Sequence, residues 1–392
     1  MTQTDRPSDQ DVSIEGHSGQ LAVAVARAHG VETMFTLSGA HVFPMYDGAV
    51  KADPPMQLLD VRHEQTAAFA AEATGKLTRV PGLAVLTAGP GVTNGISAIA
   101  QAQFAGSPMV VVGGRAPQNR WGTGSLQELD QPPIVESVAK LARTIPTAGE
   151  MLTGMDEAFV AARSPHRGPA FVDVPMDEFF NSASGAAPVP PQRLRMEPDA
   201  DALARIAGLL AQAQRPVLVL GTDVWADGAE EAALRFVQDL GIPTLTNGMG
   251  RGIVPGGHPL LVTKARGVAL GGADLVVVVG TPLDFRLGYG VFGGNEEGST
   301  PARVVHVADS PAQVSTHAEL AASAAGDLTA VFDGIQAAVE RGAKPDWSTW
   351  RQQLADTVAA AAAREAELLS AEADPIHPAR IYGELVDRKS VV

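Results

Sequence analysis

Short runs of apolar residues alternate along the chain with longer segments in which apolar positions recur every three or four residues. The runs are rich in Val and Leu, and they are too uniformly apolar for strands with one face in water, so they predict parallel strands covered on both sides. Helices are predicted in most of the other segments, at 18–29, 66–77, 199–213, 229–240, 262–270 and 327–341. This alternation is typical of an α/β fold with doubly wound parallel sheets and right-handed crossovers. The predicted strands lie at 31–37, 57–61, 83–87, 109–112, 170–174, 216–220, 242–246, 273–279 and 304–308.

The alternation occurs in two blocks, separated by the segment NSASGAAPVPPQRLRMEP at 181–198. This segment is rich in Ser, Ala and Pro and has no periodicity, which is typical of a linker. The length of 392 residues fits two or three domains, because single cores seldom grow beyond about 250–300 residues. We therefore predict a disordered tail at 1–17, an N-terminal domain at 18–182, a linker at 183–199 and a Rossmann-like central domain at 200–341. Residues 342–392 are predicted to form an Ala- and Glu-rich helical connector and the start of a further domain.

Composition and charge exclude several kinds of binding partner and site. The net charge is −15 and no basic cluster is present, which argues against nucleic acid or an anionic membrane as a partner. The absence of cysteine excludes disulfides, thiolate catalysis and Cys-ligated zinc. The opening segment MTQTDRPSDQDVSIEGHSG has no apolar signal core, and no apolar run approaches the roughly 20 residues of a membrane span. We expect a cytoplasmic protein that binds a small molecule.

Glu64 lies where the predicted strand at 57–61 gives way to an Ala-rich helix at 66–77. Ligands of open α/β sheets bind beyond the carboxyl ends of the strands. Position alone favours an ordinary carboxylate in the first turn of a helix, which the helix dipole stabilises by about 0.3–1 kcal/mol. The next strand ends in a similar turn, Gly89-Pro90-Gly91-Val92-Thr93-Asn94. This turn matches neither phosphate-binding glycine pattern, so we interpret its glycines as close-approach positions and Asn94 as a helix cap.

Five segments follow one another between residues 62 and 177: RHEQTAAFAAE, LTAGPGVTNGISAIAQA, SPMVVVGG, GTGSLQELD and RGPAFVDVPMD. In order and spacing they resemble the N-terminal half of thiamine-diphosphate-dependent enzymes, and they are most similar to the acetolactate synthase group. The later segments GMGRGIVPGGHP and VGTPLDFRLGYG resemble the central domain of the same family.

The resemblance assigns roles to residues of the N-terminal domain. It implies that Glu64 hydrogen-bonds the N1′ nitrogen of the cofactor's aminopyrimidine, which stabilises the imino tautomer that removes the thiazolium C2 proton; the ylid is then the nucleophile. It also implies that Gln127 faces the active-site channel and that Gly39, Pro90 and Asn94 line the cofactor. Ser38 and Ala40 stand where acetolactate synthases commonly show proline and paired glycines. His41 fits either an acid or base, or a polar residue just after a helix cap.

The central domain has two interpretations. In acetolactate synthases the equivalent domain holds FAD, and in oxalyl-CoA decarboxylases it holds ADP, so the resemblance implies FAD or ADP bound by Gly280, Asp284, Arg286 and Asp309. The alternative is a Rossmann-like domain without ligand, in which Arg286 makes a surface ion pair. The segment TKARGVALG departs from the Leu-Gly-Met-His-Gly pattern of many FAD-binding members.

The C-terminal segment DPIHPARIYGELVDR resembles the opening helix of the family's third domain. In the family, that domain carries a Gly-Asp-Gly segment and asparagines that hold Mg²⁺ and, through it, the diphosphate. We therefore expect this chain to be truncated and to supply only the aminopyrimidine half of the site. A complete site would need Mg²⁺ and a partner, either a second copy in a homodimer or homotetramer, or a separate C-terminal domain.

The function implied by the resemblance is that of an acetolactate synthase in branched-chain amino-acid biosynthesis, which decarboxylates pyruvate and joins the remaining fragment to a 2-oxo acid. One alternative is a 2-hydroxyacyl-CoA lyase or oxalyl-CoA decarboxylase, to which the run ELDQ points. The other is a truncated protein without catalysis, which dimerises or binds a nucleotide.

Overall fold

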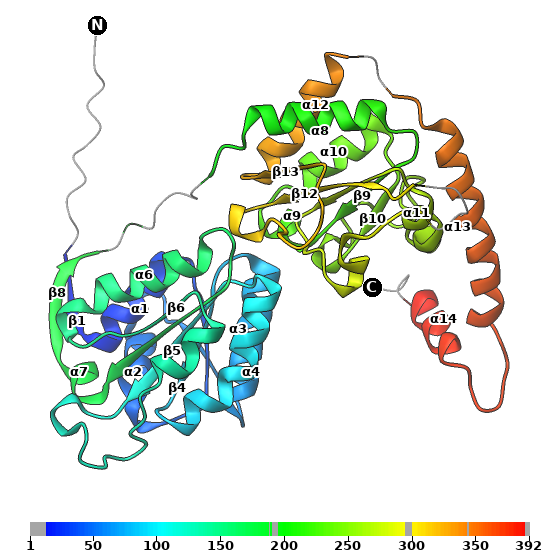
Figure 1. The fold of residues 1–392 in the computed structure, drawn as a ribbon. Coiled ribbons are helices and arrows are strands. Elements are labelled where there is room, and N and C mark those ends of the chain that lie inside the picture. The colour runs from blue at the N-terminus through cyan, green and yellow to red at the C-terminus, as the bar shows by residue number, and fades with distance from the viewer. Residues whose placement is uncertain (1–12, 188, 190–194, 295–299, 343–344, 389–392) are drawn as a thin grey trace, which may run out of the picture. The chain divides into compact units, whose positions relative to one another are not determined.

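The computed structural model describes residues 13–187, 189, 195–294, 300–342 and 345–388. The chain forms two compact units, 1–194 and 195–392 (Figure 1). The division falls within the segment predicted as a linker; part of that segment, residues 188 and 190–194, lies outside the described residues.

The N-terminal unit contains a parallel sheet of six strands in the order β3-β2-β4-β5-β7-β6. The central strands β4, β5 and β7 are buried along their whole length, which explains their continuous apolar runs. The edge strand β3 is largely exposed. The strands are β2 Thr33–Thr36, β3 Gln57–Asp60, β4 Gly82–Leu86, β5 Met109–Arg115, β6 Leu141–Thr144 and β7 Pro169–Pro175.

Helices cover both faces of this sheet. Alternate residues of a strand point to opposite faces, and here Leu83 and Val85 join one core cluster while Ala84 and Leu86 join another. The first cluster includes Leu21 of α1 and the second Ile99 of α4. The helices are α1 Ser18–Ala28, α2 Phe43–Lys51, α3 Glu64–Thr78, α4 Pro90–Ala105, α5 Pro132–Val135, α6 Met151–Arg163 and α7 Met176–Phe180.

A two-stranded ribbon corrects the predicted ends of this unit. Strand β1 Ser13–His17 pairs antiparallel with β8 Ser182–Ala186, so the tail predicted at 1–17 and the linker predicted at 183–199 both include residues that form a strand. Residues 1–12 lie outside the described residues. The ribbon leads into α1 through a capping box, in which His17 and Gln20 each accept a hydrogen bond from the other's backbone N–H.

The central unit contains a parallel sheet of five strands in the order β10-β9-β11-β12-β13. Leu218 and Val277 join the core on one face, and Val219 and Val276 join the core on the other. The strands are β9 Pro216–Leu220, β10 Thr244–Thr246, β11 Leu275–Val279, β12 Arg303–Ala308 and β13 Ala322–Ala325, and the helices are α8 Ala200–Gln212, α9 Thr222–Ala226, α10 Glu230–Leu240, α11 Arg266–Gly272 and α12 Leu328–Glu340. Both units therefore confirm the predicted doubly wound α/β fold.

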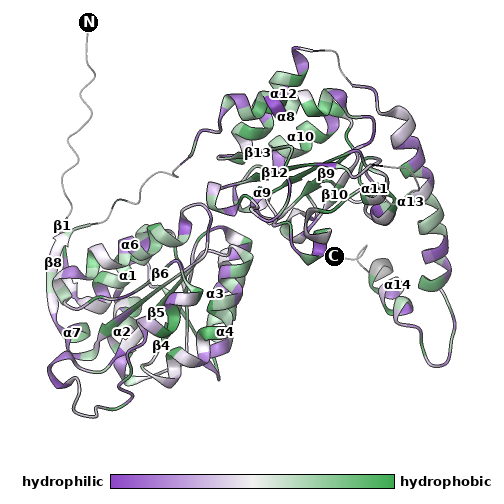
Figure 2. Ribbon diagram, in the orientation of Figure 1, coloured by the Kyte–Doolittle hydropathy of each residue, from purple (hydrophilic) through white to green (hydrophobic). Residues whose placement is uncertain are grey.

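Two further helices follow the central sheet, α13 Ser348–Leu369 and α14 Pro378–Arg388. The first turns of α13 belong to the core of the unit, because Trp350 and Leu354 are buried there and the Trp350 indole N–H donates to Pro216 O at 3.1 Å. Farther along, α13 is mostly exposed. Figure 2 shows the same contrast, with hydrophobic strands inside each unit and many hydrophilic residues on α13.

Candidate functional site

Glu64 is the first residue of α3, just beyond the carboxyl end of β3. Its side chain is buried, with 9% exposed. The Asn94 side-chain amide of α4 donates to Glu64 Oε2 at 2.9 Å. Glu64 Oε1 accepts no hydrogen bond from the part of the chain that the structure describes. Among the described residues, the protein therefore fixes one oxygen of this carboxylate by a side-chain hydrogen bond.

The turn before α4 brings backbone close to this carboxylate. A Cβ added at Gly91 would lie 3.7 Å from Glu64 Oε1 and 2.6 Å from Thr87 Cγ2, so a side chain at Gly91 would crowd Thr87. Gly89 is the N-cap, with φ 58° and ψ −112°, and Pro90 begins the helix. The prediction that Asn94 caps α4 is wrong, because the helix begins four residues earlier and leaves the Asn94 amide for Glu64.

Gly39 and His41, in the segment after β2, both contact Thr87, which lies just before the Gly89 turn. A Cβ at Gly39 would lie 2.3 Å from Thr87 Cβ, so the turn after β2 packs directly on Thr87. His41 is 3% exposed, and its Nδ1 is 3.2 Å from Thr87 Oγ1. Burial lowers the pKa of His41 below its ordinary 6.5, which outweighs a hydrogen bond with the Leu126 backbone. His41 is therefore a neutral, buried group that packs against the loops of the site.

Gln127 reaches the site from the loop after β5. Its Oε1 is 3.5 Å from the Thr87 hydroxyl, and its carbonyl oxygen lies 2.9 Å from the position of a Cβ at Gly89. Its φ of 57° is uncommon for a residue other than glycine. Nearby, the Glu128 carboxylate accepts the backbone N–H groups of Gly122 and Ser125, so Glu128 shapes the loop. The structure therefore gathers the predicted residues Glu64, Gln127, Gly39, Pro90 and Asn94 around one turn.

A buried polar group beneath this turn was not found from the sequence. Gln131 and Asp173 are 1% and 0% exposed, and they are hydrogen-bonded to each other at 2.8 Å. Burial raises the pKa of the Asp173 carboxyl, while hydrogen bonds from Thr144, Gln131 and Arg115 act in the opposite direction. Gln131 is the last residue of the run ELDQ, but no sequence pattern links it to Asp173, which lies 42 positions farther along the chain.

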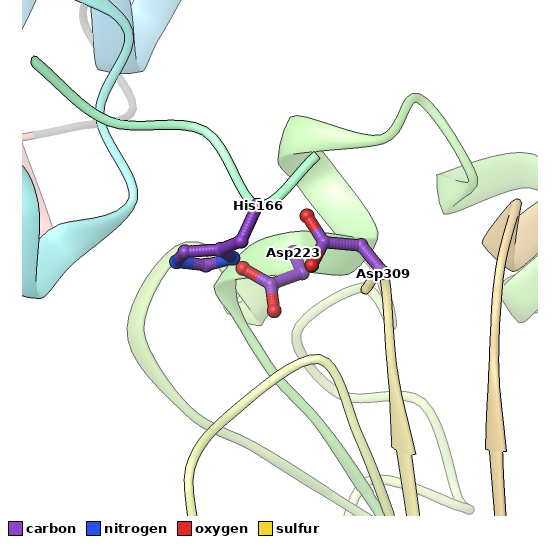
Figure 3. A group of neighbouring side chains, drawn as sticks. All are labelled: His166, Asp223 and Asp309. Carbon is purple, nitrogen blue, oxygen red and sulfur yellow. The ribbon is translucent and has the colours of Figure 1, made fainter. Parts of the chain in front are cut away.

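In the central unit, Asp309 follows β12 and Gly280 follows β11. Asp309 lies beside Asp223 of α9, with carboxylate oxygens within 4.8 Å of one another (Figure 3). Gly280 has φ 68°, and its Cβ position lies 2.9 Å from Asp223 Cβ, so only glycine lets the β11 loop approach α9 this closely. The figure also draws His166, which belongs to the N-terminal unit and is not assigned to this group.

Asp284 and Arg286 bind each other. The Arg286 guanidinium donates to the Asp284 carboxylate at 2.6 Å, and Asp284 also accepts the Arg286 backbone N–H at 2.9 Å. Burial acts to raise the pKa of Asp284, but the hydrogen bonds and charge of Arg286 outweigh it and hold that pKa below its usual range. With Arg286 46% exposed, the pair matches the alternative of a surface ion pair.

Each of the two units matches a separate model of one known protein family. Residues 17–134 match the family model described as thiamine pyrophosphate enzyme, N-terminal TPP binding domain, and residues 203–335 match the model described as thiamine pyrophosphate enzyme, central domain. This chain belongs to the thiamine pyrophosphate enzymes. The predicted resemblance is therefore confirmed, and the α/β fold of this thiamine pyrophosphate enzyme agrees with it.

Two kinds of protein are among the relatives of this thiamine pyrophosphate enzyme. The chain is 46% identical over 375 residues to the "Probable acetolactate synthase" of Mycobacterium bovis and to the "Acetolactate synthase large subunit IlvG" of Mycobacterium tuberculosis, which covers 94% of this chain and 66% of each relative. It is 33% identical over 311 residues to the human "2-hydroxyacyl-CoA lyase 2", covering 70% of this chain and 49% of the relative. The acetolactate synthase group thus fits better, and the chain spans slightly less than two thirds of the length of those relatives.

Within the part of the chain that the structure describes, no helix of this thiamine pyrophosphate enzyme has both the length and the apolar character needed to cross a membrane.

Proposed function

We propose that the N-terminal unit binds the aminopyrimidine of thiamine diphosphate through Glu64, and that the protein acts as an acetolactate-synthase-like carboligase on pyruvate and a second 2-oxo acid. The observation that carries the proposal is the buried Glu64 carboxylate, whose Oε2 is held by Asn94 while Oε1 accepts nothing from the described chain. The identity of 46% to the mycobacterial acetolactate synthases supports the choice of reaction.

Each residue of the site has a distinct task in this proposal. Glu64 would hold a ring nitrogen and share its proton through Oε1, and Asn94 keeps the carboxylate in the required orientation. Gly91 lets the turn before α4 pack on Thr87 beside the carboxylate, because a Cβ there would lie 2.6 Å from Thr87 Cγ2. Gln127 would contact the substrate, since its loop lies against the Gly89 turn. When bound, the cofactor supplies a carbon nucleophile and an electron sink for decarboxylation.

Mg²⁺ and a partner complete this proposal. A hard cation suits the oxygens of a diphosphate, and we propose that a second copy of the chain or a separate cofactor domain contributes the residues that bind it. In the central unit, Gly280, Asp309 and Asp223 lie beyond the carboxyl ends of β9, β11 and β12. Nucleotides bind at this edge of open α/β sheets, so FAD or ADP is the proposed ligand there. Because the Arg286 guanidinium is paired with Asp284, we propose that Arg286 contributes less to nucleotide binding than Gly280 and Asp309.

The test is a titration of the ¹⁵N-labelled chain with thiamine diphosphate, with and without Mg²⁺. We expect the amide signals of Gly89, Gly91 and Asn94 to shift. A Glu64→Gln variant should bind roughly tenfold more weakly, because a charge-assisted hydrogen bond is about twice as strong as a neutral one. The matched control is Glu72→Gln, which changes another buried carboxylate of α3 that is bonded to Ser107 and should leave binding unchanged.

The outcomes separate the parts of the proposal. Equal affinity of the Glu64→Gln variant and the unchanged chain, or shifts confined to other regions, would contradict the assignment of Glu64. Binding that does not depend on Mg²⁺ fits a chain that contributes the aminopyrimidine half. Binding that requires Mg²⁺ would show that copies of this chain hold the diphosphate without a separate cofactor domain.

A further inference from the structure

The side chain of Gln131 connects the sheet to the Gly89 turn. Its Oε1 accepts the Gly89 N–H at 2.8 Å, and its Nε2 donates to Gly114 O at 2.9 Å and to Asp173 Oδ2 at 2.8 Å. These partners fix the orientation of the amide. A reversed amide would set an NH₂ group against the Gly89 donor and an oxygen against two acceptors.

Asp173 anchors Gln131 to three neighbouring strands. It lies on β7 and is fully buried. Its Oδ1 accepts from the Thr144 hydroxyl of β6 at 2.6 Å, and its Oδ2 accepts from Arg115 of β5 at 3.1 Å and from Gln131. With donors on both oxygens, the carboxylate holds a fixed position at the carboxyl end of the sheet.

The Gly89 turn depends on an acceptor from outside α4. Gly89 has no side chain with which to cap the helix, and its own N–H is taken by Gln131. Asn94 follows one turn into α4 and contacts Glu64. Since the backbone of an α-helix is rigid over one turn, the orientation of the Gly89 turn determines where the Asn94 amide lies.

We propose that Gln131, anchored by Asp173, is a positioning residue for Glu64, because it holds the Gly89 turn and with it the Asn94 amide on Glu64 Oε2. The contact path runs from Asp173 through Gln131 and Gly89 to Asn94 and Glu64. It deepens the proposed function, on which it rests only for the identity of the ligand.

The test follows the side-chain NH₂ signals of asparagine, of which the chain has few: Asn94, Asn119, Asn181, Asn247 and Asn295. Selective ¹⁵N-asparagine labelling and an Asn94→Ala variant identify the Asn94 pair. A Glu64→Ala variant gives its frequency without the carboxylate. Gln131→Met keeps the length of the side chain but removes its three hydrogen bonds, and it should move the Asn94 pair at least half of the way to that frequency.

Ser18→Ala is the matched control for lost stability. Ser18 is fully buried and its hydroxyl donates to Glu178 O at 2.7 Å, away from the path through Gln131. The control should lower the melting temperature without moving the Asn94 signals. An unchanged Asn94 pair in folded Gln131→Met, or an equal displacement in Ser18→Ala, would overturn the proposal.

A measurement on the unchanged chain covers the case in which Gln131→Met does not fold. The Gly89 amide should exchange with deuterium at least about a hundredfold more slowly than an unstructured amide, because opening requires loss of the Gln131 contact. An unprotected Gly89 would overturn the proposal by itself. Neither measurement uses the cofactor, so a chain that passes both and fails the thiamine diphosphate titration would retain the positioning role and lose the proposed function.

Discussion

Individual glycines determine how closely the loops of the site approach one another. Gly39 and Gly91 both face Thr87, and the Cβ positions of both are occupied by atoms of that residue. Thr87 in turn contacts His41 and Gln127. The loops after β2, β4 and β5 therefore meet at one threonine, and this meeting depends on the absence of two side chains.

We expect Gly39→Ala to destabilise the N-terminal unit by about 1–3 kcal/mol, the usual cost of an added methyl group in a packed site. The added Cβ would lie 2.3 Å from Thr87 Cβ, so Thr87 must move. Urea unfolding measures the effect. Gly149→Ala is the control, since its Cβ would approach no heavy atom closer than 4.0 Å; equal losses in the two variants would contradict the proposed crowding.

Sequence reasoning named residues that the structure brings together around one turn, but not the residues that support them. Glu64 and Gln127 were singled out because a family pattern surrounds them. Asn94 was given a wrong role, since the capping preference describes sequence position and cannot show that Gly89 already starts the helix. Gln131 was missed because its partners Gly89 and Asp173 are 42 positions away in either direction, and only the folded sheet brings them together.

At the level of elements, buried histidine connects the loops at the carboxyl end of the central sheet. His306 of β12 is 1% exposed. Its Nε2 lies 3.1 Å from Thr281 O, and its Nδ1 accepts the Ser315 N–H at 2.9 Å. The ring is thus neutral, with the proton on Nε2. Burial lowers the pKa of His306 below 6.5; the Thr281 carbonyl acts to raise it, and the charge of His317 lowers it further.

This pKa predicts how the stability of the central unit depends on pH. Below 6.5 the unfolded chain binds a proton at His306 that the folded unit does not, so the free energy of unfolding falls as the pH decreases from there toward the lower folded pKa. At higher pH this contribution is fully present. Urea unfolding between pH 5 and 8 should show the loss, and His306→Gln should reduce it. An identical pH profile in the variant would contradict the prediction.

The elements themselves were recovered unevenly from the sequence. Apolar runs such as those of β9 and β11 were found because burial on both faces leaves a strong pattern. Strand β13, with the sequence ASAA, has little intrinsic preference for a strand and forms by pairing with β12. The amphipathic helix α6 was overlooked, although Met151, Met155, Ala158, Phe159 and Ala162 give it a helical period that could have been found.

At the scale of the molecule, each unit has cores of its own, and α13 belongs to the central one. The sequence indicated a connector at this place, because its Ala- and Glu-rich composition is typical of a solvated helix. Trp350 and Leu354 show that the beginning of the helix is a packed part of the domain. The composition of a long helix cannot reveal which single turn is buried.

We expect Leu354→Ala to destabilise the central unit by about 2–5 kcal/mol, the usual cost of such a truncation in a core. Leu354 is fully buried, whereas Leu368 on the same helix is 46% exposed and Leu368→Ala serves as the control. Hydrogen exchange with mass spectrometry reports the two units separately. Faster exchange in the N-terminal sheet than in the unchanged chain would contradict the assignment of α13 to the central unit alone.

The β1–β8 ribbon places Ser13 opposite Ala186, so the two ends of the described part of the N-terminal unit are neighbours. A short loop could join the two ends of such a domain, and the chain could then be opened elsewhere without disturbing the sheet. The domain could also be inserted into another protein. Such a circularly permuted domain, opened in the exposed loop around Gly122 and Gly124, would keep the turn at Gly89 and the carboxylate of Glu64 within one uninterrupted stretch of chain.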